Sequence, residues 1–74
     1  MADETLDAKG LNCPMPIIKA RKILKGMEAG QTLDIEATDP GAVKDFDAFC
    51  EMTGHVLLHS GQDGDVYNFT IRRA

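Results

Sequence analysis

Positive charge is scarce in this sequence, where 8 lysines and arginines stand against 12 aspartates and glutamates and the formal net charge is −4. Binding to a phosphate backbone requires a basic surface, so nucleic acid is not expected as a direct partner. No apolar run approaches the roughly 20 residues of a membrane-spanning helix. The segment from Met1 to Thr5 is short and acidic, unlike a secretory signal. We therefore expect a cytoplasmic protein that binds no membrane.

Cysteine and histidine are also few. Cys13 and Cys50 are too few for a disulfide framework, so both are expected to be thiols in a reducing compartment. Cys13 is followed by Pro-Met-Pro instead of completing a Cys-x-x-Cys pair, so dithiol chemistry lacks its second sulfur. His55 and His59 lie four apart on one face of an expected strand, but a structural zinc site needs four ligands. No metal site is predicted.

The length of 74 residues allows one domain, 1–74, which buries about 60% of its unfolded surface. A large enclosed active-site cavity is therefore not expected. Residues 1–4 are expected to be disordered. With 43% hydrophobic and 27% charged residues, the chain has the composition of an ordinary globular protein.

Hydrophobic periodicity and turn residues predict six elements. Strands are expected at 5–9, 31–38, 55–60 and 66–72, and helices at 14–25 and 40–53. The order β-α-β-α-β-β makes the first two strands parallel and the last two an antiparallel hairpin with a turn at 61–64. The expected fold is a two-layer α/β sandwich of the α+β type, with a four-stranded mixed sheet and both helices on one face.

The apolar positions of these elements predict the core. The expected inward residues are Leu6, Ala8, Ile17, Ala20, Ile23, Leu24, Met27, Leu33, Ile35, Ala37, Ala42, Val43, Phe46, Phe49, Cys50, Val56, Leu58, Tyr67, Phe69 and Ile71. Cys50 falls on the apolar stripe of the second helix, which is typical of an inert core cysteine.

Cys13 is predicted to occupy a helix N-cap, because Pro14 suits the first helical position. Sulfur is an unusual cap, whereas the second helix has the ordinary cap Asp39 before Pro40. The helix dipole favours a thiolate at this place, although Pro14 and Pro16 remove N–H donors. The prolines also fix the backbone around the sulfur. We interpret Cys13 as an exposed reactive thiol; the alternative is a small apolar residue that ends a loop.

The outward face of the first helix combines apolar and basic side chains. Its residues are Met15, Ile18, Lys19, Lys22 and Lys25. We interpret this face as a partner-binding surface with an electrostatic preference for acidic proteins. The alternative for the lysines is an ordinary solvated helix face.

Five segments of the chain form a recognisable set: Leu6-Asp7-Ala8, Gly10 to Pro16, Asp39-Pro40, Phe49-Cys50 ahead of Gly54-His55, and Tyr67 to Arg73. Together they resemble the TusA (SirA-like) family of small sulfur carrier proteins over nearly the whole chain. The diagnostic element is Cys-Pro-x-Pro at the start of the first helix.

The resemblance implies the same β-α-β-α-β-β sandwich and a function. By position, Cys13 would accept sulfane sulfur as a persulfide and relay it to an acceptor protein, with Pro14 and Pro16 as the motif prolines. The donor would be a cysteine desulfurase or a rhodanese, and the pathway tRNA 2-thiouridine synthesis or dissimilatory sulfur oxidation. Such a protein is a carrier with a sulfurtransferase-like relay, needs no cofactor beyond the carried sulfur, and is expected to be a monomer that forms transient complexes.

Two other functions stay open. In the first, the chain is a non-catalytic interaction or regulatory module that docks through the first helix, and Cys13 is incidental. In the second, Cys13 and Cys50 form a thiol redox pair. Modification of Cys13 by a persulfide donor separates the carrier from both alternatives.

Overall fold

The computed structural model describes residues 2–74. Its elements follow the order β1 (Glu4–Ala8), α1 (Met15–Lys25), β2 (Thr32–Ala37), α2 (Ala42–Thr53), β3 (Val56–Asp63) and β4 (Val66–Arg72). Neither helix is long and apolar enough to cross a membrane.

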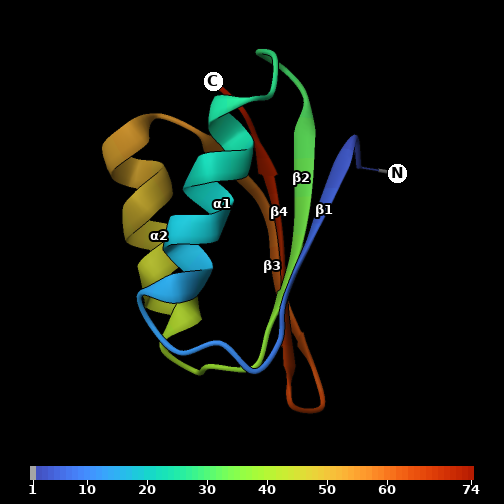
Figure 1. Cartoon of the computed structure of the whole chain (residues 1–74), viewed down its shortest axis with the longest axis vertical. Helices are drawn as coiled ribbons and strands as arrows, with labels where there is room; N and C mark the ends of the chain where they lie inside the picture. The colour runs from blue at the N-terminus through green and yellow to red at the C-terminus, as the bar shows by residue number, and fades with distance from the viewer. Residues whose placement is uncertain (1) are drawn as a thin grey trace.

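The four strands form one mixed sheet in the order β1-β2-β4-β3. β1 and β2 are parallel, with Leu6 opposite Ile35, and β4 runs antiparallel to both of its neighbours, β2 and β3. Both helices cover the same face of this sheet, as Figure 1 shows. The predicted fold class, strand directions and layer arrangement are therefore confirmed.

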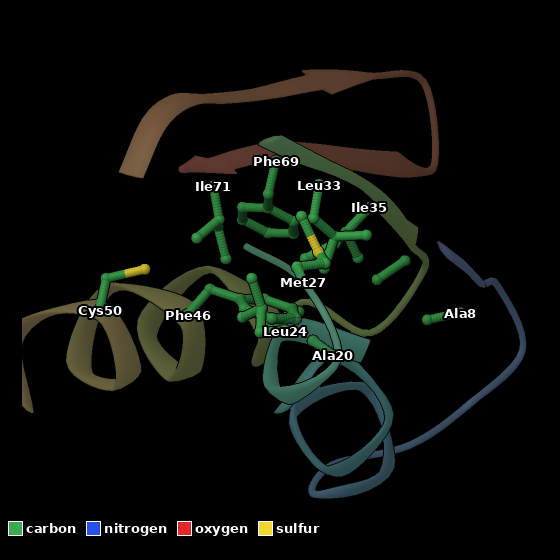
Figure 2. Packing of buried hydrophobic residues seen from close by; sticks show 12 residues of the cluster. Ala8, Ala20, Leu24, Met27, Leu33, Ile35, Phe46, Cys50, Phe69 and Ile71 are labelled. Atoms are coloured by element: carbon green, nitrogen blue, oxygen red, sulfur yellow. The ribbon is translucent and has the colours of Figure 1, made fainter. Parts of the chain in front are cut away.

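The core lies between the helices and the sheet. Figure 2 shows Phe46 of α2 and Leu24 of α1 directed toward the inward side chains of β2 and β4. The rings of Phe46 and Phe69 are 4.8 Å apart between centroids, a distance at which aromatic pairs attract. Pro16 is also buried, which the sequence pattern did not predict. Val43, expected inside, is 38% exposed, because it lies at the far edge of the buried stripe of α2.

The chain is ordered further toward its N-terminus than expected. β1 begins at Glu4, and the backbone N–H of Asp3 donates to the Thr32 carbonyl at 3.0 Å. The Asp3 carboxylate accepts the Thr32 backbone N–H in return, at 2.9 Å. The expected disorder of residues 1–4 is therefore wrong for Asp3 and Glu4, because these bonds extend the edge of the sheet. Met1 lies outside the described residues.

β3 is the element where periodicity misplaced the side chains. Val56 and Leu58 were expected inside but are 39% and 49% exposed, whereas Leu57 packs against the core. The reason is the pairing with β4, where Leu57 lies opposite the buried Ile71 and Val56 opposite Arg72; beyond Leu57 the pairing shifts register, which turns His59 to the outer face. An extra residue in one strand reverses the face of everything beyond it. The hairpin turn is also shorter than expected, with Gly64 at φ 61° directly after β3.

Candidate functional site

The site lies where the two strand-to-helix loops meet, below the first turns of α1 and α2 (Figure 1). The loops are tied together by the Gly10 backbone N–H, which donates to the Thr38 hydroxyl at 2.9 Å. Parallel strands β1 and β2 end at the same edge of the sheet, so each delivers its loop to this place. Segments 26 to 28 residues apart in the sequence are thereby joined at one site.

Cys13 lies in the first of these loops, before the helix instead of at its cap. α1 begins at Met15, with Pro14 at the N-cap position, Pro16 in the first turn and no side-chain cap. The peptide bond between Cys13 and Pro14 is cis. The Met15 backbone N–H donates to the Asn12 carbonyl at 2.8 Å, so it does not serve the sulfur. The prediction of Cys13 as N-cap is therefore wrong, because a turn separates it from the helix.

Asp39 holds both loops through its two carboxylate oxygens. Oδ2 accepts the Cys13 backbone N–H at 2.7 Å, and Oδ1 accepts the Gly41 backbone N–H at 3.0 Å. These two bonds hold the pKa of Asp39 below its ordinary value, because they favour the charged carboxylate. α2 begins at Ala42, so Asp39 stands before the N-cap Gly41 and not at the predicted N-cap position. Asp39 still accepts a hydrogen bond from the backbone N–H of Gly41, just before the helix.

The Cys13 thiol is exposed, as predicted, and its electrostatic surroundings favour the neutral thiol. Hydrogen bonding to the Asp45 carboxylate raises the pKa of Cys13 above its ordinary value. Some loss of solvation and the negative charges of Asp45 and Asp39 raise the pKa further. The two carboxylates therefore outweigh any stabilisation of the thiolate by the helix end, whose first turn is depleted of N–H donors.

The predicted partner face of α1 is exposed. Met15 and Ile18 have exposed fractions of 41% and 50%, and Lys19, Lys22 and Lys25 lie on the surface around them. Helical spacing turns most of these side chains away from the buried row of Pro16, Ala20 and Leu24. Two large apolar side chains next to lysines thus lie two and five residues along the chain from Cys13.

Cys50 is separated from this site by burial. It is 5% exposed, belongs to the core cluster and extends from α2 toward the sheet in Figure 2. Burial raises the pKa of its thiol, because the charged form loses solvation. Both cysteines are free in this structure. Cys50 is thus a core thiol, whereas Cys13 is an exposed one.

The two histidines lie on opposite sides of the sheet. His55 is half-buried near α2, where its ring centroid lies 5.8 Å from that of Phe49 and its Nδ1 accepts the Ala74 backbone N–H. Burial lowers the pKa of His55, with a further contribution from Arg73. His59 lies on the uncovered face of the sheet beside Asp34 and Thr70. The spacing of four residues predicted that both histidines lie on one face of a strand. This is wrong, because the register shift between Leu57 and His59 turns His59 to the other face.

Sequence reasoning missed Asp45 and the groove next to it. The groove runs from Cys13 between α1 and α2, has a volume of about 290 Å³ and is mostly apolar. Its lining residues are Cys13, Pro14, Ile17, Asp45, Ala48, Phe49 and Met52. The available signal was helical spacing, because Asp45, Ala48, Phe49 and Met52 repeat at intervals of three and four along α2.

Comparison with known proteins identifies relatives over nearly the full chain. A family model described as "Sulfurtransferase TusA" matches residues 4–73. The sulfur carrier protein TusA of Allochromatium vinosum is 51% identical over 72 residues, which cover 97% of this chain and 95% of that protein. The putative sulfur carrier protein YrkI of Bacillus subtilis is 44% identical, with 97% and 96% covered.

A solved structure has the same architecture. The crystal structure of a SirA-like protein from Desulfitobacterium hafniense superposes with a TM-score of 0.83 at 28% sequence identity. The superposition covers 93% of this chain and 95% of the other.

Proposed function

Because the chain belongs to the TusA family and is a sulfur carrier protein, we propose that Cys13 is the residue that carries the sulfur, as a persulfide. The observation that carries this proposal is the contrast between the two thiols. Cys13 is exposed where the two loops meet, whereas Cys50 is 5% exposed inside the core. A sulfur that two other proteins must reach in turn has to be accessible.

The chemistry of loading moves one sulfur atom without net oxidation. The Cys13 thiolate attacks the outer sulfur of a donor persulfide, a new S–S bond forms at Cys13, and the S–S bond of the donor breaks. The donor cysteine leaves as a thiolate and takes up the proton that Cys13 lost. Unloading repeats the step in reverse roles, with an acceptor thiolate attacking the outer sulfur and Cys13 as the leaving group.

The loop structure supports this role. Pro14 and Pro16 restrict the backbone on one side of Cys13, and Asp39 accepts its backbone N–H on the other. A sulfur held in one orientation on a rigid loop suits attack along the S–S axis. In this proposal the sulfur itself is the only group carried, and no further cofactor takes part.

A sulfur carrier exchanges sulfur with donor and acceptor proteins, and in our proposal the exposed face of α1 guides both. The lysines at 19, 22 and 25 attract acidic surfaces, and Met15 and Ile18 supply a small apolar contact. The proposed donor is a cysteine desulfurase or a rhodanese. The acceptor belongs to tRNA 2-thiouridine synthesis or to dissimilatory sulfur oxidation. The complexes are transient, the carrier is a monomer, and the relay takes place in the cytoplasm.

The test is an intact-mass measurement after incubation with a cysteine desulfurase and free cysteine. We expect the wild-type chain and Cys50→Ala to gain the mass of one sulfur atom, removable by a reductant. Cys13→Ser should gain none. An adduct retained in Cys13→Ser, or mapped to Cys50, would refute the proposed role of Cys13.

A further inference from the structure

The groove next to Cys13 has two apolar walls and one charged end. Ile17 of α1 faces Ala48, Phe49 and Met52 of α2, and Met52 is 86% exposed. The groove volume of about 290 Å³ corresponds to about ten water molecules. This is room for one or two side chains of another protein.

Asp45 gives this groove its charge. Its side chain is half-buried and lines the groove together with Cys13. Within residues 2–74 the ion pairs join Lys9 to Asp7 and to Glu36, so Asp45 has no cationic partner there. A carboxylate beside apolar surface is costly to cover unless a cation accompanies what covers it. The groove is therefore complementary to an apolar side chain combined with a positive charge.

We propose that this groove receives the loop of a partner protein in which the reacting cysteine is accompanied by an apolar side chain, which enters between α1 and α2, and by a lysine or arginine, which pairs with Asp45. This inference rests on the proposed function, because it describes the partner that meets the sulfur of Cys13. It assigns to Asp45 a positioning and selecting role outside the sulfur transfer itself.

The consequence is that docking activates the sulfur. The charged groups that act on Cys13 are Asp45 of α2 and Asp39 of the preceding loop, while the α1 wall of the groove is apolar. In the free carrier these carboxylates raise the pKa of Cys13, which lowers its thiolate fraction. A thiol of higher pKa is also a slower leaving group when the persulfide is attacked. A partner cation against Asp45 neutralises the largest of these contributions and so reduces both obstacles at the moment of transfer.

Charged thiol reagents test the selection directly. Cationic trimethylammonioethyl methanethiosulfonate and anionic sulfonatoethyl methanethiosulfonate both form a disulfide with Cys13 and release methanesulfinate. The measurement is made in a Cys50→Ala background. The rate constant for the cationic reagent is divided by that for the anionic reagent, and the ratio is divided by the same ratio for free glutathione. We expect this normalised ratio to fall about fivefold when Asp45 is replaced by Asn. Asp47→Asn is the matched control, since Asp47 is exposed on α2 and does not line the groove.

The pH profile gives a second readout that a purely structural role would not move. Alkylation of Cys13 by neutral iodoacetamide should reach its midpoint at lower pH in Asp45→Asn than in the wild type, and Asp47→Asn should not differ from the wild type. An unchanged rate ratio together with an unchanged midpoint in Asp45→Asn would overturn the inference.

Peptides test the apolar part. Mixed disulfides of Arg-Cys-Leu, Glu-Cys-Leu and Arg-Cys-Ser with thionitrobenzoate should react with Cys13 fastest for the first, and Met52→Glu should remove the advantage of leucine over serine. Equal rates for all three would refute the proposed occupant. The mass measurement with the desulfurase is independent: if Cys13 still takes up sulfur, only the groove inference fails, and if it does not, the proposed function fails.

Discussion

The carboxylate of Asp39 lies 2.7 Å from the backbone nitrogen of Cys13, across 26 residues of sequence. Each residue follows a strand and precedes a helix, so the two occupy equivalent places in the two halves of the fold. The bond makes the position of the thiol depend on the second half of the chain. It also places negative charge next to the sulfur.

Replacing Asp39 should destabilise the fold in a pH-dependent way. The pKa of Asp39 is lowered below 3.8 in the folded chain, so its carboxylate contributes stability that is fully present above that pH. This contribution is lost as the pH falls from 3.8 through the folded value. We therefore expect Asp39→Ala to melt below the wild type at pH 7, and the difference in melting temperature to shrink in acid. Asp47→Ala is the control, and a pH-independent difference would contradict the assignment.

Cys50 should respond to polar substitution and to alkaline pH. Cys50→Ser places a hydroxyl in the core and should lower the free energy of unfolding by about 1–3 kcal/mol, more than Cys50→Ala. Because the pKa of Cys50 is raised above 9.0, its contribution to stability is present below that pH and lost as the pH rises through the folded value.

Denaturant titrations at increasing pH measure this loss of stability. They compare two chains that both carry Cys13→Ser, one with Cys50 and one with Cys50→Ala. The Cys50→Ala chain should lack it. Equal pH slopes in the two chains would contradict the buried position of the Cys50 thiol.

Replacement by alanine should affect the stability of the fold very differently at two adjacent leucines in β3. Leu57 packs against the core, so Leu57→Ala should lower the free energy of unfolding by about 2 kcal/mol. Leu58 is 49% exposed, so Leu58→Ala should change it by less than about 0.5 kcal/mol. Urea unfolding of the two variants measures the difference. The reverse order would show that the register of β3 is wrong.

The lysines of α1 should control the rate of sulfur loading. We expect Lys19→Glu combined with Lys22→Glu to slow persulfide transfer from a cysteine desulfurase about tenfold at low salt, because a repulsive charge replaces an attractive one. The defect should diminish at high salt. Lys44→Glu, on the exposed side of α2, serves as control. If the rate of transfer fell no further than in Lys44→Glu, the lysines of α1 would form only an ordinary solvated helix face.

The strands, helices and layer order were predictable because each has a regular local pattern. Alternation in β2, with Leu33, Ile35 and Ala37 inward, and helical spacing in α1 give the right faces. β3 was misassigned because its inward face is set by the pairing of Leu57 with Ile71 of β4, and three successive apolar residues, Val56 to Leu58, do not indicate that phase locally. The helix starts were placed early because turns that precede α1 and α2 contain the same prolines that open helices.

At the site, the exposure of Cys13 was predictable from its prolines, but the electrostatic environment was not. Asp45 and Asp39 reach the sulfur or its backbone from the other half of the chain, a proximity that only the folded structure creates. The role of Asp39 near the start of the second helix was partly visible as a cap signal. Its second bond, to Cys13, had no counterpart in the local sequence.

The C-terminus lies at the end of α1 opposite the loop that precedes this helix (Figure 1), and that loop contains Cys13. Arg73 Nε donates to the Leu24 carbonyl at 2.7 Å near the end of α1, and the Ala74 backbone N–H donates to His55. The molecule extends 30 Å along its longest axis. A bead, dye or second domain attached at Ala74 would therefore leave the thiol facing outward, and such an immobilised carrier could be loaded and unloaded by proteins in free solution.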